Sequence, residues 1–193
     1  MKVLIVGEGK SELGYRCEDG ALPILVKRLL PVAQTPTCEQ VSSNKVKTHR
    51  PPGRGNGFEK RALAWIRYAE RQGFQALVLL IDQDGCEDRH GQLDRAQADV
   101  RMGLSRALGV AVRTFDAWML ADEKALSSAL GWVVQRQPKP EAIPDPKAVC
   151  EDLLKGAGKG EKYAAVATEA EIAVLEDRCP RGFRPFAGRV RAL

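Results

Sequence analysis

Residues 77–85 read LVLLIDQDG, an apolar run that ends in two aspartates and a glycine. With Ala76 the run has the length of a strand, and continuous apolar runs of this length are typical of central parallel strands that are covered on both faces. Parallel strands need crossover connections, which are usually helices. The stretch therefore predicts an α/β fold with a buried strand that ends at Asp82.

The rest of the chain alternates between strand and helix patterns. Strands are predicted at 3–6, at 76–82, at 110–118 and, more weakly, at 39–47. Helices are predicted at 22–30, at 58–71, at 87–108, where Gly109 would follow the helix end, and at 119–130. This order predicts an open, mostly parallel, Rossmann-like sheet that is flanked by helices. We expect residues 1–135 to form this core and residues 136–193 to form a helical carboxyl-terminal extension packed on it.

Composition narrows the class of protein. The chain has 193 residues, and 30 lysines and arginines against 25 acids give a formal charge of +5, which is compatible with a polyanionic partner without requiring one. Five scattered cysteines form no C-x-x-C pair, so neither a disulfide framework nor a zinc site is expected. The sequence contains no apolar stretch near the roughly 18 residues of a membrane span and no signal peptide pattern. We therefore expect a cytoplasmic protein that does not enter a membrane.

The segment KVLIVGEGKSE, residues 2–12, contains the Gly-Lys-Ser that closes a phosphate-binding loop. That motif needs its first glycine five residues before Gly9, and Leu4 occupies the position inside an apolar run. The segment instead predicts a strand that delivers Glu8 to the carboxyl edge of the sheet, where open α/β folds place their ligands.

Acids lie at or near the ends of three predicted strands. Asp82 and Asp84 alternate along an extended segment, so both carboxylates can point to one side. The carboxyl ends of parallel strands share one edge, and we expect Glu8 and Asp116 to converge with this pair. Crowded carboxylates call for a cation, and hard oxygen ligands favour Mg²⁺ or Mn²⁺. The alternative is that Asp84 and Gly85 only form the turn that ends the strand.

Five motifs in order resemble the DUF4276 family of Toprim-like proteins: VGEGKSE, LLIDQDG, FDAWMLAD, KGEKYAAV and CPRGFRPFAGRV. The acid and glycine after the first strand and the later Asp-x-Asp also resemble the Toprim domain of topoisomerases, primases and overcoming-lysogenization-defect nucleases. The resemblance covers almost the whole chain. One residue departs from it, because Asp116 stands where the family usually has glutamate, and its shorter side chain changes the ligation distance.

The resemblance implies divalent-metal-dependent phosphoryl transfer on nucleic acid. Asp82 and Asp84 would hold metal, Glu8 would bind a second ion or act as general acid or base, and Asp116 would be a further ligand. Two ions about 4 Å apart stabilise both oxygens of an in-line displacement. Lysines would contribute positive charge next to the phosphate: Lys10, Lys159 and Lys162. Because no tyrosine has a nucleophile context, hydrolysis is the expected reaction.

Further basic residues precede and begin the helix predicted at 58–71: Lys45, Lys47, Arg50, Arg54 and Lys60. A glycine-rich basic loop can follow a nucleic-acid backbone, but a solvated loop has the same composition. Two other functions stay open. The resemblance includes proteins that accompany ATPases in bacterial antiviral systems, so the chain can be a non-catalytic or partner-activated subunit. Asp-x-Asp-Gly after an apolar strand also occurs in haloacid-dehalogenase phosphatases.

Overall fold

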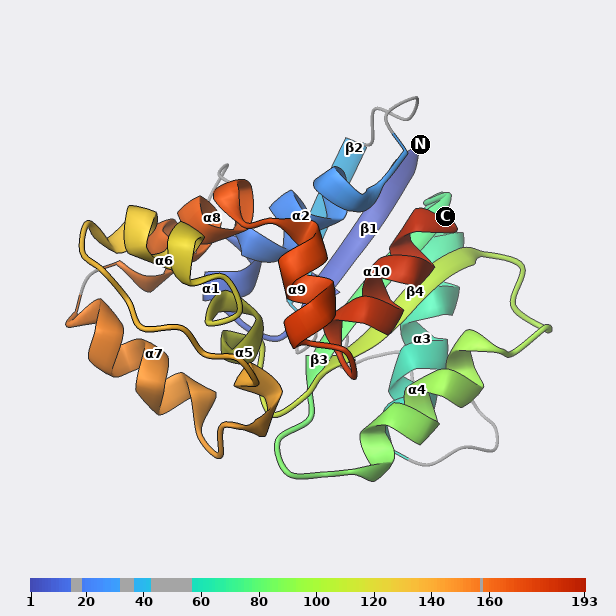
Figure 1. The fold of residues 1–193 in the computed structure, drawn as a ribbon. Coiled ribbons are helices and arrows are strands. Elements are labelled where there is room, and N and C mark those ends of the chain that lie inside the picture. The colour runs from blue at the N-terminus through green and yellow to red at the C-terminus, as the bar shows by residue number, and fades with distance from the viewer. Residues whose placement is uncertain (15–18, 32–36, 43–56, 157) are drawn as a thin grey trace.

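The protein is described by a computed structural model, which covers residues 1–193 except 15–18, 32–36, 43–56 and 157. Its sheet contains the strands β1 (Lys2–Gly7), β2 (Thr37–Ser42), β3 (Ala76–Asp82) and β4 (Ser105–Ala111). All strands are parallel and their order is β2-β1-β3-β4, so the predicted α/β fold with an open parallel sheet is confirmed (Figure 1).

The described helices before the last strand are α1 (Lys10–Leu13), α2 (Ala21–Leu29), α3 (Gly57–Arg71) and α4 (Asp88–Gln97). After β4 come α5 (Asp116–Met119), α6 (Glu123–Leu130), the 3-10 turn η2 (Pro140–Ala142), α7 (Pro146–Leu154), α8 (Lys159–Glu169), α9 (Ile172–Arg178) and α10 (Phe183–Arg191). Within the described ranges, none of these helices has the length and apolar character needed to cross a membrane.

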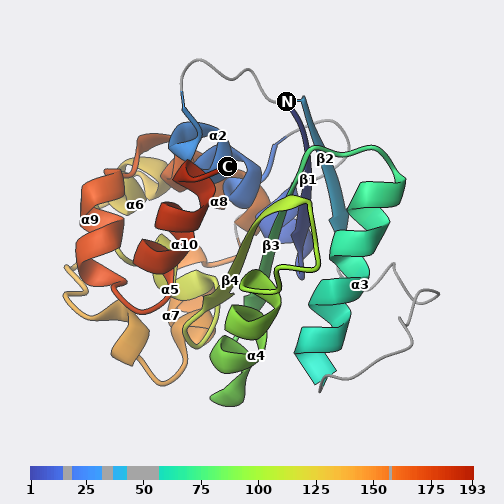
Figure 2. The same cartoon turned by 90° about the vertical axis from the view of Figure 1, so that its right-hand side faces the viewer.

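Helices cover both faces of the sheet, as the apolar strands predict. Successive side chains of a strand point to opposite faces, and β3 divides its buried residues accordingly. Val78 and Leu80 join a core with α2 and the carboxyl-terminal helices, whereas Leu77 and Leu79 join a second core with α3 and α4. Figure 2 shows these two helix layers on either side of the strands.

The prediction of one helix from 87 to 108 followed by a strand from 110 to 118 is wrong in its boundaries. Helix α4 ends at Gln97, β4 runs through Gly109 and ends at Ala111, and Asp116 begins α5. Gly109 is needed inside the strand because α10 packs directly on it. A Cβ atom at this position would lie 2.5 Å from Cδ2 of Phe186, a distance that packed side chains do not adopt.

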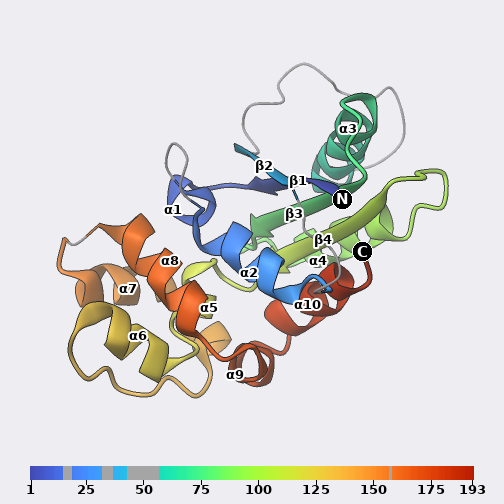
Figure 3. The same ribbon diagram turned by 90° about the horizontal axis from the view of Figure 1, so that it is seen from above.

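The helices after β4 extend the molecule at one edge of the sheet. Helix α10 packs on β4, while α8 packs on α1 and α2. Figure 3 shows α1, α5, α6, α7 and α8 gathered beyond the carboxyl ends of the strands, whereas both chain termini lie toward the opposite end. The edge that receives the acids is therefore bordered by helices from both ends of the chain.

Candidate functional site

Glu8 and Asp82 meet at the carboxyl edge of the sheet. Glu8 follows β1 and Asp82 ends β3, and these strands are paired in parallel. The carboxylate oxygen Oε2 of Glu8 accepts a hydrogen bond from the backbone N–H of Asp82 over 3.0 Å. The convergence predicted from the sequence is thus present for these two acids.

A second bond of the same kind fixes the Asp82 side chain. Its Oδ1 accepts from the backbone N–H of Phe115, just before α5, over 2.7 Å. The remaining oxygens, Oδ2 of Asp82 and Oε1 of Glu8, accept no hydrogen bond from the described part of the chain. Each carboxylate is therefore held in place by one oxygen and leaves the other for a ligand.

Glu12 is a third acid of the site, and the sequence reasoning did not assign it a role. Its Oε2 accepts from the backbone N–H of Glu8 over 3.2 Å. The neighbouring glycines leave room for this carboxylate, because a Cβ at Gly9 would lie 3.0 Å from Oε1 and a Cβ at Gly7 would lie 3.1 Å from Oε2. The signal that was available is the pair of glycines around Glu8, followed by an acid four residues after it.

We call Glu8, Glu12 and Asp82 the acidic cluster. Burial, followed by the negative charges of Glu12, Glu8 and Asp84, raises the pKa of Asp82 to about 8. Burial is also the main cause that raises the pKa of Glu12 to about 7, and the charges of Glu8 and Asp116 add to it. Carboxyls that keep protons near neutral pH mark a deficit of positive charge at this edge.

Asp116 lies near the cluster but already has partners. Its Oδ1 accepts from Lys159 Nζ over 2.6 Å and from the Tyr163 hydroxyl over 2.5 Å. Burial raises the pKa of Asp116, but the bonds from Lys159 and Tyr163 outweigh it, so the pKa lies below its ordinary value. Asp116 thus remains charged and anchors Lys159 near this edge.

Asp84 does not point the way that the Asp-x-Asp spacing predicts. Its backbone adopts a left-handed conformation with a φ of 44°, and Gly85 follows with a φ of 72°. The side chain is 52% exposed and forms an ion pair with Arg89 over 2.9 Å. Arg89 also donates to the backbone carbonyl of Asp82. Asp84 and Gly85 therefore form the turn that ends the strand, which was the alternative to a metal-binding role for Asp84.

The other predicted site residues are spread more widely. Lys10 is exposed on α1, and Lys60 is exposed on α3. Lys162 lies on α8, where its Nζ donates to the backbone carbonyl of Ala129 in α6 over 2.7 Å, so its ammonium group is bound to that helix. The remaining residues of the predicted basic loop lie outside the described part of the chain: Lys45, Lys47, Arg50 and Arg54.

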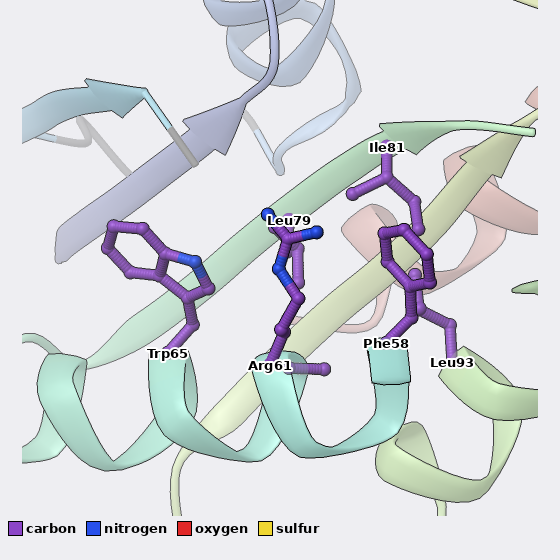
Figure 4. Close-up of a pocket in the computed structure, with 7 residues that line it drawn as sticks. Phe58, Arg61, Trp65, Leu79, Ile81 and Leu93 are labelled. Atoms are coloured by element: carbon purple, nitrogen blue, oxygen red, sulfur yellow. The ribbon is translucent and has the colours of Figure 1, made fainter. Parts of the chain in front are cut away.

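The face of the sheet below α3 contains a small hollow that does not resemble a ligand site. It is lined by apolar side chains and Arg61, and Figure 4 shows Phe58 and Leu93 meeting near Ile81 at one end of it. The hollow has a volume of about 10 Å³, which is close to the minimum that a single water molecule needs. The hollow is therefore too small to hold a substrate.

The cluster suits a divalent cation by donor type and charge. Carboxylate oxygens are the ligands that Mg²⁺ and Mn²⁺ favour, and the raised pKa values of Asp82 and Glu12 would be relieved by positive charge. Among the residues that the structure describes, no three acidic, histidine or cysteine side chains form a preassembled metal site. Comparison of the chain with models of protein families, with curated proteins and with solved structures found no match in any of the three.

Proposed function

We propose that this protein is a divalent-metal-dependent nuclease that hydrolyses phosphodiester bonds of nucleic acid. One observation carries the proposal: Glu8, Glu12 and Asp82 are gathered from α1, β1 and β3 at the carboxyl edge of a parallel sheet, where burial and mutual repulsion raise the pKa of Asp82 to about 8. Acidic side chains are concentrated in this way in sites where bound metal ions balance their negative charge and also bind the phosphate of the substrate.

The residues of the edge have separable roles in this proposal. Glu8, Glu12 and Asp82 would hold Mg²⁺ or Mn²⁺, and two such ions supply Lewis acidity and activate water when bound. Lys159, which Asp116 orients over 2.6 Å, provides positive charge for the phosphate. Glu8 and Asp82 each keep one oxygen free of hydrogen bonds from the described chain, and either can accept a proton from an attacking water.

Hydrolysis is favoured over transfer to Tyr163. The Tyr163 side chain is 1% exposed and its hydroxyl donates to Asp116. Burial is the main cause that raises the pKa of this hydroxyl above its ordinary value, which opposes formation of a phenolate nucleophile. Water is therefore the nucleophile of the proposed reaction.

A partner-activated subunit is the second candidate, and the Asp84–Arg89 ion pair favours it. Asp84 would have to leave Arg89 to join the acidic cluster, and a partner could supply the interactions that release it. The resemblance to proteins that accompany ATPases in bacterial antiviral systems suggests a separate ATPase as this partner. The same resemblance is the basis for proposing a role in antiviral defence.

The direct test is cleavage of supercoiled DNA, single-stranded DNA and RNA with Mg²⁺ or Mn²⁺. We expect the parent protein to cut at least one of these substrates. Because Asp82→Asn and Glu12→Gln each replace a carboxyl group that would hold the metal ion with a neutral amide, we expect each to lower the rate by at least about 100-fold. Products are measured on denaturing gels at matched protein concentrations.

The matched control is Asp152→Asn, which removes the same charge from an exposed position on α7. Equal cleavage by parent and cluster variants would contradict the proposal. Cleavage by the parent only after an ATPase partner is added would support the partner-activated subunit. Release of inorganic phosphate from small phosphomonoesters, with no cut in nucleic acid, would support a haloacid-dehalogenase-like phosphatase.

A further inference from the structure

A second feature of the carboxyl edge is a cleft of about 580 Å³. Its walls are the ends of β3 and β4, the segment that contains η2, and the turn between α9 and α10. Gln83, which lines the cleft, lies between Asp82 and Asp84 in the chain. The volume is within the range of about 300–1,000 Å³ that is usual for ligand pockets.

Three basic side chains of this cleft have no partner in the described part of the chain. Arg113, Lys139 and Arg181 line it and belong to exposed residues, and no hydrogen bond or ion pair joins their side chains to a described residue. Arg178 differs, because it binds Glu123 and the carbonyl of Ala121. The free guanidinium and ammonium groups are suited to phosphate oxygens.

The backbone holds Arg113 in an unfavourable conformation. Its φ of 63° is left-handed, which is uncommon for a residue with a Cβ atom. Its N–H donates to Oε1 of the buried Gln83 over 3.1 Å, and its carbonyl accepts from Asp84 N–H over 3.1 Å. Non-glycine residues in such conformations are strained and cluster at ligand sites. The ends of β3 and β4 thus hold the backbone of Arg113 in place, while its side chain has no partner among the described residues.

Within the described residues, the acids of the cleft form no ion pair with these cations, although Arg181 lies close enough to Glu141 for its charge to act on that carboxyl. Glu141 is 8% exposed, and its two oxygens accept from the backbone N–H groups of Arg181 and Gly182 over 3.0 and 2.7 Å. Glu87 and Asp177 are exposed and form no ion pair with a residue of the described ranges. The lining of the cleft therefore contains four basic residues against three acids, with Arg178 already bound to Glu123, whereas the acidic cluster contains no basic residue.

We propose that this cleft binds the sugar-phosphate backbone of a nucleic-acid strand whose neighbouring phosphodiester lies at the acidic cluster. The inference rests on the proposed function, because it assigns the cations to the same substrate. Arg113 would contact the phosphate nearest the cluster, since its backbone is bonded to Gln83 and Asp84. Lys139 and Arg181, which also line the cleft, would contact phosphates further along the strand.

The test measures binding without cleavage. A short fluorescent oligonucleotide is titrated with protein in EDTA, and its anisotropy is followed at salt concentrations between about 50 and 200 mM. The test variant combines Arg113→Gln, Lys139→Gln and Arg181→Gln. If each cation contacts one phosphate of a single strand, the slope of log K against log salt becomes shallower by about 2, at about 0.7 for each lost contact.

The control variant removes the same charge outside the cleft, through Arg67→Gln, Arg71→Gln and Lys124→Gln. These side chains lie on α3 and α6 and have no partner among the described residues. We expect their loss to weaken binding slightly without a comparable change in slope. Circular dichroism and thermal unfolding of all variants verify that the fold is retained.

The outcomes separate the two proposals. If the parent binds the oligonucleotide and the cleft variant has the same slope as the control variant, the cleft assignment is overturned whether or not the protein cleaves nucleic acid. It is also overturned if the parent binds no oligonucleotide. A third result against it would come from competition: an unlabelled mononucleotide that displaces the fluorescent oligonucleotide as effectively as an unlabelled oligonucleotide does. If the cleft residues are needed for binding but the protein cleaves nothing with Mg²⁺ or Mn²⁺, the proposed hydrolysis is contradicted. The cleft is then supported as a nucleic-acid-binding site.

Discussion

Two carboxyl groups of the acidic cluster hold protons at a pH where ordinary carboxyls have lost them. The pKa of Asp82 is raised to about 8 and that of Glu12 to about 7, in both cases mainly by burial. In an unfolded chain the same groups titrate near pH 4. The folded protein therefore binds more protons than the unfolded chain between about pH 4 and pH 8.

This difference predicts a decrease in stability with rising pH when no divalent cation is present. The contribution of Asp82 and Glu12 is complete below about pH 4 and is lost as the pH rises through their folded-state pKa values, so the free energy of unfolding in EDTA should fall by about 6 kcal/mol between pH 5 and pH 8.5. For a chain of this size the melting temperature should fall by about 12–24 °C. Thermal unfolding at a series of pH values measures the change.

The combined variant Asp82→Asn and Glu12→Gln should flatten this dependence, because neither amide titrates. Asp152→Asn is the matched control and should keep the slope of the parent. Mg²⁺ or Mn²⁺ should stabilise the parent more at pH 8.5 than at pH 5, since cations compete with protons for these oxygens. Parallel pH profiles for the parent and the combined variant would show that the cluster does not carry these protons.

Among single residues, the sequence predicted where Glu8 and Asp82 lie, but it did not predict the role of Glu12 or the direction in which the Asp84 side chain points. Glu8 and Asp82 could be found because each follows an apolar strand, and parallel strands end at one edge. Glu12 was missed because its role depends on space that Gly7 and Gly9 leave around it. Asp84 was predicted to face the cluster, but a left-handed turn and the ion pair with Arg89 direct its side chain elsewhere. The prediction was wrong because side chains alternate only within a strand, and β3 ends at Asp82.

At the scale of elements, β4 is the strand that the sequence placed incorrectly. Gly109 resembles a helix end in the sequence, yet it lies in the middle of Ser105–Ala111. The reason is a contact with a helix that follows much later in the chain, since the Phe186 ring of α10 occupies the space of a side chain at position 109. Local propensity contains no information about such a contact, whereas β1 and β3 are long apolar runs that local pattern identifies.

This packing predicts the effect of a single methyl group. In Gly109→Ala the Cβ would lie 2.5 Å from the Phe186 ring, so either the ring or β4 must shift. We expect a loss of about 1–3 kcal/mol in the free energy of unfolding, as is usual for overpacked cores. Urea unfolding at equilibrium measures the loss.

Gly103→Ala is the matched control, because nothing lies within 4 Å of a Cβ at that exposed position. It should leave stability nearly unchanged. If the contact with Phe186 is the cause, the double variant Gly109→Ala with Phe186→Leu should be more stable than the sum of the two single changes. Strict additivity would contradict this explanation.

At the scale of the whole molecule, the carboxyl-terminal helices share one core with the sheet. That core contains Val78 and Leu80 of β3 together with Tyr163, Phe183 and Phe186. The helical content after residue 136 was predictable from the sequence, but its placement was not. Helix α10 packs on β4, whereas α7 and α8 lie beyond the carboxyl edge of the sheet (Figure 3). Tertiary packing determines where each of these helices lies, and local sequence patterns do not contain this information.

The shared core predicts that the chain cannot lose α10 and keep its fold. A chain that ends after Arg181 lacks Phe183, Phe186 and Val190, whose side chains are at most 1% exposed. Removing one buried phenylalanine side chain costs about 3–5 kcal/mol, so the combined loss is comparable to the whole stability of a domain. We expect loss of near-ultraviolet circular dichroism and of a cooperative unfolding transition.

Its control is a chain that ends after Arg191 and lacks only Ala192 and Leu193, which follow α10. This chain should unfold cooperatively near the melting temperature of the parent. Cooperative unfolding of the chain that ends after Arg181 would show that the sheet is stable without the helix that covers β4.

The backbone amides that hold Glu8 and Asp82 make assembly of the edge a late event in the life of each chain. Glu8 reaches its amide only when β1 and β3 are paired, and Asp82 reaches Phe115 only after the chain has passed β4. In the nascent chain, before these strands pair, the two acids lie apart and are ordinary exposed carboxyl groups. If the edge binds divalent ions as proposed, the nascent polypeptide lacks this affinity and acquires it only when the chain has folded.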